Sequence, residues 1–311
     1  MAESVRLAIN QTTNRLKWGL REAIEGYARA DIRGIGVWRD KLEQCGVSEA
    51  CKMLGDHGMT VTSLHRGGAF PASDERRRRV AIEHSRRAID LAAEVGARCL
   101  VLFVGGLADG SKDIAGAREQ VRDGIGELLP YARAASVPLA IEPQHPMFAA
   151  DRACVNTLEQ ANDLCDQFGA GLGVVDVYHV WWDRNLEAQI DRAGGERIRV
   201  FQVSDWLVPT RHLMLDRGMM GDGIIDLSQI RRWIEASSYT GFTEVEILSA
   251  QNGGRGIKTM WFVPASSATG IVVDGTQSER RRGVWASDSS QARAPRFGQS
   301  VSAVGDPELL K

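Results

Sequence analysis

Four polar side chains stand at the C-terminal ends of four successive apolar segments with strand-like composition. They are Glu142 in segment 138–142, Asp176 in 172–176, Gln202 in 199–202 and Glu246 in 243–246. Helix-like stretches of roughly 20 residues separate these segments, which is the rhythm of parallel βα units. In a closed (β/α) barrel the C-terminal strand ends converge on one mouth, where such enzymes carry their chemistry. Three carboxylates and an amide oxygen converging there would form a site for one hard divalent cation, Mg²⁺ or Mn²⁺ in preference to Zn²⁺.

The elements that would position these groups form a regular series. Eight strand-like segments are expected at 6–10, 34–38, 60–65, 99–104, 138–142, 172–176, 199–202 and 243–248. Helical periodicity follows all but the last, at 16–30, 48–57, from 73 or 74 to 95, 114–135, from 157, 186–193 and 226–237. Ser48 is the expected N-cap of the second helix, and Gly96 follows the third. Uniformly apolar strands are typical of a parallel sheet. Eight such units predict an α/β fold, a (β/α)8 TIM barrel over residues 1–250, although periodicity alone leaves an open doubly wound sheet as an alternative.

Residues 251–311 break this series, because they are irregular, rich in Gly, Ser and Arg, and lack the expected eighth helix. The codons of Met260-Trp261-Phe262, ATG TGG TTY, read x-Val-Val one base earlier. Continued across the stretch, the shifted frame allows an amphipathic helix with an acidic first turn. A single-base frameshift near codon 252 is therefore one hypothesis, and a natural disordered tail is the other. Resequencing the gene distinguishes them.

The composition of the chain excludes several functional classes. Its 311 residues hold 38 basic and 40 acidic side chains, so no strong positive charge indicates nucleic-acid binding. The five cysteines are scattered and odd in number, which favours reduced thiols in a cytoplasmic protein. The first residues lack the pattern of a secretory signal, and no apolar run approaches the roughly 20 residues of a membrane span.

Further polar residues fall where a substrate would lie. His65 ends the third strand, His179 follows Asp176 by three residues, Asp205 follows Gln202 by three, and Arg211 and Arg217 belong to the long loop after the seventh strand. An arginine there would bind a phosphate or carboxylate in bidentate fashion. A solvent-exposed loop arginine remains the alternative for each.

The four strand-end residues also have structural alternatives. Glu142 would be a solvated strand end, Asp176 a helix N-cap, and Gln202 a hydrogen-bonded core residue. Of Glu244 and Glu246 we expect one to face the barrel axis, and we assign that place to Glu246. An inward carboxylate is costly unless it is paired or metal-bound.

The pattern Ile-Glu142-Pro, Val-Asp176-x-x-His179, Gln202 with Asp205 three residues on, and Glu-Val-Glu246 resembles the xylose isomerase-like barrel superfamily. The resemblance covers roughly residues 5–250. The superfamily includes sugar phosphate isomerases/epimerases, inosose dehydratases, 3-dehydroshikimate dehydratases and the endonuclease IV group. It implies that Glu142, Asp176, the seventh-strand residue and Glu246 are the metal ligands. Most members have His on the seventh strand, and some, dehydratases among them, have Gln as here.

This resemblance implies a divalent-metal-dependent sugar (phosphate) isomerase/epimerase. Glu142 and Glu246 would form the acid/base pair that abstracts a proton next to a carbonyl through a metal-stabilised enediolate. The first alternative is a metal-dependent dehydratase of a hydroxy-keto acid or inosose, since a leaving hydroxyl beta to the carbanion would be eliminated by the same groups. The second is an inactive or destabilised product of a frameshifted gene.

The expected partner is a small sugar or polyol-derived substrate, with no nucleic acid and no membrane. An endonuclease would need several more His ligands for a zinc cluster, and the seventh strand here offers none. Homodimer or tetramer formation through the outer helices is compatible with the fold.

Overall fold

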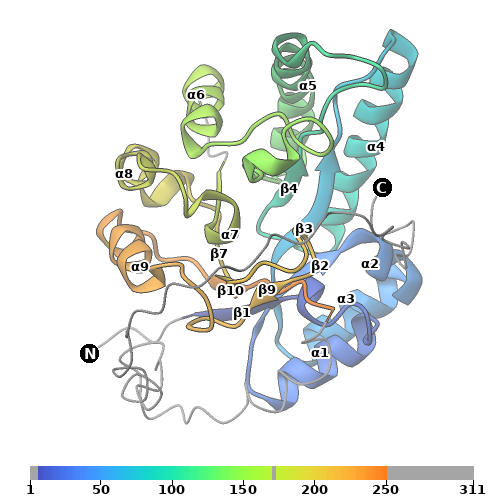
Figure 1. Ribbon diagram of the computed structural model, residues 1–311. Helices are drawn as coiled ribbons and strands as arrows, with labels where there is room; N and C mark the ends of the chain where they lie inside the picture. The colour runs from blue at the N-terminus through green and yellow to red at the C-terminus, as the bar shows by residue number, and fades with distance from the viewer. Residues whose placement is uncertain (1–5, 170–172, 251–311) are drawn as a thin grey trace, which may run out of the picture. The chain divides into compact units, whose positions relative to one another are not determined.

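A computed structural model describes residues 6–169 and 173–250, and in it eight strands form one parallel sheet. The strands are β1 (Leu7–Asn10), β2 (Gly34–Trp38), β3 (Thr60–Gly68), β4 (Leu100–Phe103), β5 (Leu139–Ile141), β6 (Val174–Asp176), β7 (Val200–Val203) and β10 (Thr243–Val245). The sheet order is β5-β4-β3-β2-β1-β10-β7-β6, so neighbours in the chain are neighbours in the sheet and the first strand pairs with the last. This is the cyclic order of a (β/α)8 barrel, which confirms the predicted fold. The sheet curls, and no ladder joins its end strands β5 and β6 in the described chain (Figure 1).

Helices follow the strands in chain order around the outside of the curled sheet (Figure 1). They are α1 (Leu20–Arg29), α2 (Arg39–Cys45), α3 (Val47–Asp56), α4 (Glu75–Glu94), α5 (Ile114–Ala134), α6 (Leu158–Phe168), α7 (Val177–Val180), α8 (Leu186–Arg197) and α9 (Leu227–Ala236). No helix in the described part of the chain is long and apolar enough to cross a membrane.

Two of the observed helix N-termini can be compared with the predicted ones. Asp74 caps α4 by accepting a hydrogen bond from the Arg77 N–H, which confirms one of the two predicted starts. The predicted N-cap Ser48 is wrong. An unforeseen helix, α2, precedes α3, and Gly46 is the residue between them. Its φ of +87° is open to glycine at little cost, so the chain turns there and α3 begins one residue before Ser48.

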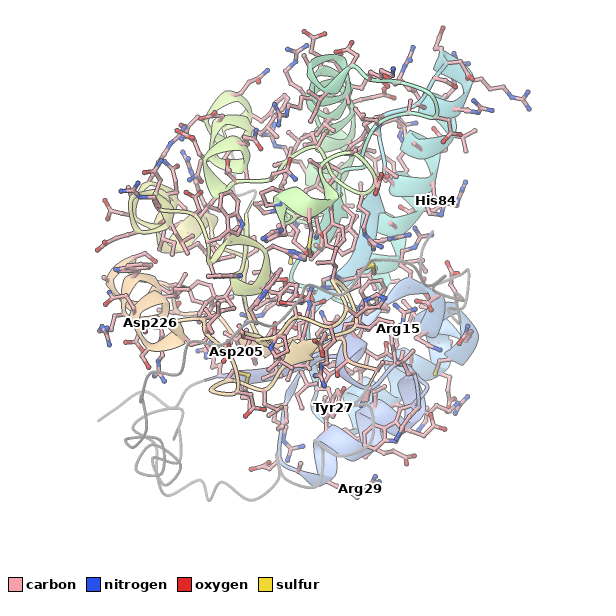
Figure 2. The ribbon with its side chains drawn as sticks, in the orientation of Figure 1. Arg15, Tyr27, Arg29, His84, Asp205 and Asp226 are labelled. Carbon is pink, nitrogen blue, oxygen red and sulfur yellow. The ribbon has the colours of Figure 1, made fainter. Side chains whose placement is uncertain are left out.

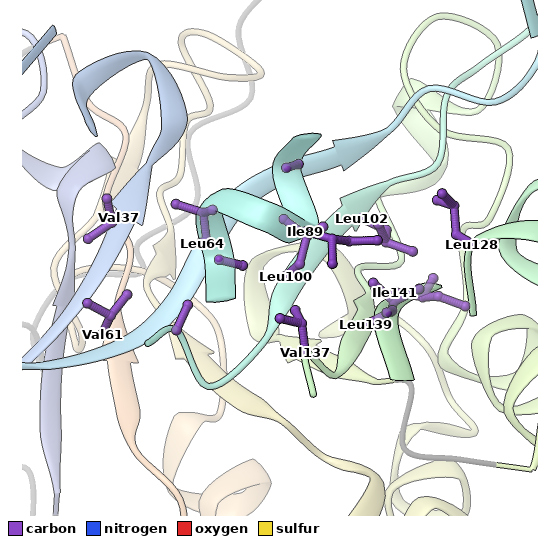
Figure 3. Packing of buried hydrophobic residues seen from close by; sticks show 14 of the residues in the cluster. Val37, Val61, Leu64, Ile89, Leu100, Leu102, Leu128, Val137, Leu139 and Ile141 are labelled. Atoms are coloured by element: carbon purple, nitrogen blue, oxygen red, sulfur yellow. The ribbon is translucent and has the colours of Figure 1, made fainter. Parts of the chain in front are cut away.

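Two apolar regions lie on opposite sides of the strands. On the outside, Ile89 of α4 and Leu128 of α5 pack with strand residues such as Leu100 and Leu139 (Figure 3). On the inside, Cys99, Val101, Ala140 and Val200 form a small buried cluster. Ala140 and Val200 precede Glu142 and Gln202 by two residues, and residues two apart on a strand point to the same face. The inner apolar cluster therefore forms the floor beneath the polar strand ends.

Glu244 and Glu246 are both buried and both belong to this polar interior. The expectation that only one of them faces the axis is wrong, because residues i and i+2 of a strand share a face. The barrel therefore buries one more carboxylate than the sequence reading assigned to it.

The predictions for residues 251–311, including the frameshift, fall outside the described residues. They remain hypotheses.

Candidate metal and substrate site

Asp176 and His179 are brought together by one turn of helix. Asp176 ends β6 and caps α7, since its Oδ1 accepts the Tyr178 N–H at 2.9 Å. The turn returns His179, three residues on, to the aspartate, so that its Nε2 lies 3.5 Å from Asp176 Oδ2. The predicted N-cap alternative for Asp176 thus holds together with a place in the site. His179 is buried, not exposed on the surface.

Glu142 follows the last residue of β5 and is also buried. Its Oε1 accepts a hydrogen bond from Gln144 Nε2 and lies 3.5 Å from His179 Nε2. Its Oε2 is buried with no hydrogen-bond partner among the described residues. A buried carboxylate oxygen without a donor is costly, and it marks a position where a cation or a substrate proton would be accepted.

The proton of His179 is placed by the main chain. The His145 N–H donates to His179 Nδ1 at 3.1 Å. Burial, with Arg217 nearby, holds the pKa of His179 well below its usual value, so the ring is neutral. A neutral imidazole carries one proton, which must then lie on Nε2, the atom that faces Glu142 and Asp176. In this tautomer the 3.1 Å approach of Arg217 Nη2 to Nε2 is a contact and not a hydrogen bond. In this tautomer His179 is a proton donor toward the site. Glu142, Asp176 and His179 also offer one ligand atom each within 4.8 Å of one another, a spacing that could hold a metal ion.

Arg217 reaches the same carboxylates from a hairpin. Its strand β9 (Arg217–Gly218) pairs antiparallel with β8 (Asp205–Trp206), and its N–H donates to Leu248 O just after β10. The guanidinium Nη1 lies 3.2 Å from Asp176 Oδ2 and 3.1 Å from Glu246 Oε2. The sequence placed Arg217 in a loop at the mouth, whereas the structure buries it inside the carboxylate cluster.

The charges of this cluster do not balance. Burial raises the pKa of Glu142 well above its usual value, and Glu246 and Asp176 raise it further. Burial also raises the pKa of Glu246 to about 8, against the attraction of Arg217. Burial alone would lower the pKa of Arg217, but Asp176 and Glu246 hold it above its usual value, so it stays charged. One guanidinium faces three carboxyl groups, and a divalent cation would offset the excess negative charge.

This imbalance predicts that the metal-free protein loses stability as pH rises from about 6.5 to about 8. Burial holds the pKa of Glu246 at about 8 in the folded state, above its ordinary value of about 4.5, so the folded state binds more protons than the unfolded state in this range, and the difference vanishes above it. The buried histidines, whose pKa values are lowered, contribute only below about pH 6.5. Urea unfolding in EDTA should show a fall of roughly 1.4 kcal/mol per pH unit for one proton, and less in Glu246→Gln. A flat wild-type profile would contradict the assignment.

Gln202 aligns with Asp176 of β6 on one side and Glu244 of β10 on the other. Its Nε2 donates to Glu244 Oε1 at 3.0 Å, whereas its Oε1 is buried with no hydrogen-bond partner in the described chain. The core hydrogen bond and an available oxygen therefore occur in one side chain. Together with the unpartnered oxygen of Glu142, this oxygen fits a hard divalent cation held by Glu142, Asp176, Gln202 and Glu246.

His65 lies deeper in the barrel, stacked on Trp38 with ring centroids 5.3 Å apart. Its Nε2 is 3.0 Å from Asn10 Nδ2 and 3.1 Å from Ser63 Oγ, and its Nδ1 has no partner among the described residues. Burial lowers the pKa of His65 to about 3, so it is neutral. The predicted substrate contact of His65 therefore has one free nitrogen to use and stays a prediction.

Two other residues that were predicted to bind substrate have local partners. The carboxylate of Asp205 (Figure 2) accepts hydrogen bonds from the main-chain N–H groups of Trp206, Gly221, Gly223 and Ile225. These hydrogen bonds shape the segment before α9, and the expected substrate contact of Asp205 stays a prediction. The half-exposed Arg211 forms an ion pair with Asp216 at 2.6 Å, so the structure does not bring it to the carboxylate cluster.

An aromatic wall flanks Arg217. Its guanidinium lies 4.3 Å from the centroid of the Tyr178 ring, which stacks on Trp206 at 4.7 Å. His145 lies 5.0 Å from Trp206 on the wall's other side. The sequence analysis missed Tyr178, Gln144 and this wall, and only the place of Tyr178 between Asp176 and His179 could have indicated it.

Comparisons with known proteins agree with this geometry. A family model described as xylose isomerase-like TIM barrel matches residues 23–261. Protein SMc04130 from Sinorhizobium meliloti 1021 is 51% identical, with a TM-score of 0.78 and alignment over 85% of this chain and 94% of that one. The IolI protein, solved with a bound zinc atom, has a TM-score of 0.73 at 18% identity over 86% and 100% of the two chains. The 3-keto-D-glucoside 4-epimerase of E. coli has a TM-score of 0.64 at 16% identity over 82% and 97%. At such low identities the last two share the fold alone.

Proposed function

The chain belongs to the xylose isomerase-like TIM barrel family, and from that premise we propose that it is a divalent-metal-dependent isomerase or epimerase of a small sugar or polyol-derived substrate. One observation carries the proposal. The buried carboxyl groups of Asp176 and Glu246 contact one guanidinium, that of Glu142 lies 3.5 Å from the His179 beside Asp176, and Gln202, aligned with Asp176, has an unpartnered amide oxygen in the described chain. Such a set has the donor atoms and the negative charge that Mg²⁺ or Mn²⁺ requires.

Glu142 and Glu246 stand at the two ends of a row of contacts. Glu142 touches His179, His179 touches Asp176, Asp176 touches Arg217, and Arg217 touches Glu246. A substrate carbon held over the middle of this row would have a carboxyl group on each side. One carboxylate would take the proton from that carbon. The other would return a proton to the opposite face of the same carbon in an epimerisation, or to the neighbouring carbon in an isomerisation.

The remaining groups would orient the substrate. The Nε2–H of His179 and the guanidinium of Arg217 are donors for substrate oxygens, and the Tyr178–Trp206 wall offers an apolar surface to a sugar carbon chain. A bound divalent cation would polarise the substrate carbonyl and stabilise the negative charge that develops there.

The proposal is tested by metal content and by exchange of the reacting proton. We expect the purified chain to bind about one Mn²⁺ or Mg²⁺ and to lose turnover in EDTA. With Mn²⁺ restored, a keto-sugar substrate should incorporate solvent deuterium at the carbon next to its carbonyl, as proton abstraction requires. A folded chain that binds no divalent cation would overturn the proposal.

A second function, dehydration of a hydroxy-keto acid, is favoured by Arg152. This half-buried guanidinium lies 5.4 Å from the centroid of the Phe148 ring, which itself contacts His179 at 6.1 Å. Its Nη1 lies 3.1 Å from Met214 Sδ, and it forms no ion pair within the described residues. Burial lowers the pKa of Arg152, although Glu142 opposes this. A cation so placed beside the site suits a substrate carboxylate.

We therefore expect Arg152→Met to separate the two substrate classes. It should raise KM for a hydroxy-keto acid by about 10- to 100-fold, because a charge-assisted hydrogen bond is lost, and leave KM for a neutral keto-sugar nearly unchanged. Arg29→Met is the matched control, since Arg29 is exposed at the end of α1 and forms its ion pair with Glu25 of the same helix (Figure 2). Equal effects on acidic and neutral substrates would remove Arg152 from substrate recognition.

A further inference from the structure

Glu244 is a fully buried carboxylate held by neutral groups. Its oxygens accept hydrogen bonds from Asn10 Nδ2 at 2.8 Å, Gln202 Nε2 at 3.0 Å, Thr62 Oγ1, and Ser63 Oγ at 3.1 and 3.2 Å. Within the described residues no Lys or Arg lies within ion-pair distance of it. Burying a charge is costly even when it is hydrogen-bonded. An apolar residue would avoid this cost, so we expect Glu244 to have a role that requires its carboxyl group.

The residues packed around Glu244 leave space for its carboxyl group and orient the side chain of Asn10 toward it. A Cβ on Gly36 would lie 2.7 Å from Glu244 Oε1 and 2.9 Å from Asn10 Nδ2, closer than real side chains approach. Asn10 is itself oriented, because its Oδ1 accepts the Trp38 Nε1–H at 2.9 Å and so leaves Nδ2 to donate to Glu244. Residues of four strands, β1, β2, β3 and β7, therefore hold this carboxylate of β10 in one position.

This carboxylate decides which end of the Gln202 amide faces the site. Asn10, Thr62 and Ser63 all donate to the Glu244 oxygens, so these oxygens act as acceptors, and Gln202 presents its NH₂ group to Oε1. The carbonyl Oε1 then turns away from β10, toward the β6 side where Asp176 is the aligned residue. Oε1 is buried there with no hydrogen-bond partner in the described chain.

We propose that Glu244 is a positioning residue that fixes Gln202 as an oxygen ligand for the divalent cation. The inference rests on the proposed function, since it requires a cation at Glu142, Asp176, Gln202 and Glu246. Without Glu244 the amide would rotate freely, and half of its orientations would present NH₂, which repels a cation. Groups behind a metal ligand commonly change metal affinity by about 10- to 100-fold.

A double-mutant cycle on Mn²⁺ affinity tests this, measured by calorimetry on metal-free protein. We expect Glu244→Leu, which removes the acceptor and keeps a side chain of similar size, to weaken Mn²⁺ binding by about tenfold or more, and Gln202→Ala to do the same. In the double variant, Glu244→Leu should add less than about twofold, because the side chain through which it acts is gone. Multiplicative losses would show that Glu244 acts independently of Gln202 and would overturn the inference.

Thr62→Val is the matched control. It removes another donor to Glu244 without touching Gln202, so it should lower stability while Mn²⁺ affinity changes by less than about threefold. A loss of affinity equal to that of Glu244→Leu would mean that general loosening of the barrel, and not the amide, controls binding.

Two further outcomes are distinguishable. If circular dichroism shows that Glu244→Leu is unfolded, Glu244→Asp replaces it in the cycle. This variant keeps the charge but withdraws the carboxylate from Gln202, and the same non-additivity is expected. A wild-type chain that binds no Mn²⁺ would overturn the proposed function itself, whereas binding with multiplicative losses would overturn only the role of Glu244.

Discussion

Glu246→Gln and Glu142→Gln are each expected to lower kcat by about 10²- to 10⁴-fold without unfolding the protein. Gln is nearly isosteric with Glu, and its carbonyl oxygen can still accept the hydrogen bond that Arg217 Nη1 now donates to Glu246. What it cannot do is take a proton from carbon. The loss should therefore appear in the proton-transfer step and much less in substrate affinity.

The two variants should differ in the proton exchange that they retain. If Glu142 and Glu246 serve opposite faces of the substrate, each variant still exchanges the proton of one epimer with solvent deuterium but fails to convert that epimer into the other. Proton NMR in D₂O measures both reactions. Glu235→Gln is the control, because Glu235 is exposed on α9 and, among the described residues, forms an ion pair only with Arg231 of the same helix. Variants that both retained wild-type turnover would remove these carboxylates from the mechanism.

The sequence was sufficient for the strands and for which of their ends carry polar groups. The strand segments are apolar because they are buried on both faces, so the sequence itself shows where each strand begins and ends. Four of these segments end in a polar side chain that exposure to solvent does not account for. Gln202 shows how far this goes. Its place on β7 was predictable, but its two hydrogen-bonding ends acquire different surroundings only when β10 brings Glu244 alongside.

Long-range contacts account for what the sequence analysis got wrong or missed. The sequence analysis placed Arg217 in a loop because its hairpin depends on contacts with distant residues. Its strand pairs with Asp205–Trp206, and its main-chain N–H donates to Leu248 O. The sequence analysis also missed that the Asp205 carboxylate accepts hydrogen bonds from main-chain N–H groups 16 to 20 residues further along the chain. Glu244, by contrast, was within reach of the sequence alone, since the alternation of a strand already places it on the same face as Glu246.

Arg217→Met is expected to separate stability from metal binding. In the metal-free protein it should cost about 3–5 kcal/mol of unfolding free energy, because Asp176 and Glu246 lose the only guanidinium that contacts them in the described chain. Added Mn²⁺ should restore more stability to the variant than it adds to the wild type, since it then supplies the missing positive charge. Urea unfolding in EDTA and in Mn²⁺ measures both differences.

The same substitution should tighten Mn²⁺ binding while it lowers kcat. A buried cation within 3.2 Å of Asp176 and Glu246 repels a second cation held by the same oxygens. Removing it therefore favours the metal, although the substrate loses a donor. Arg231→Met, which breaks only the exposed pair on α9, should change neither quantity. Weaker Mn²⁺ binding by Arg217→Met would mean that the guanidinium holds the carboxylates in position for the cation and does not compete with it.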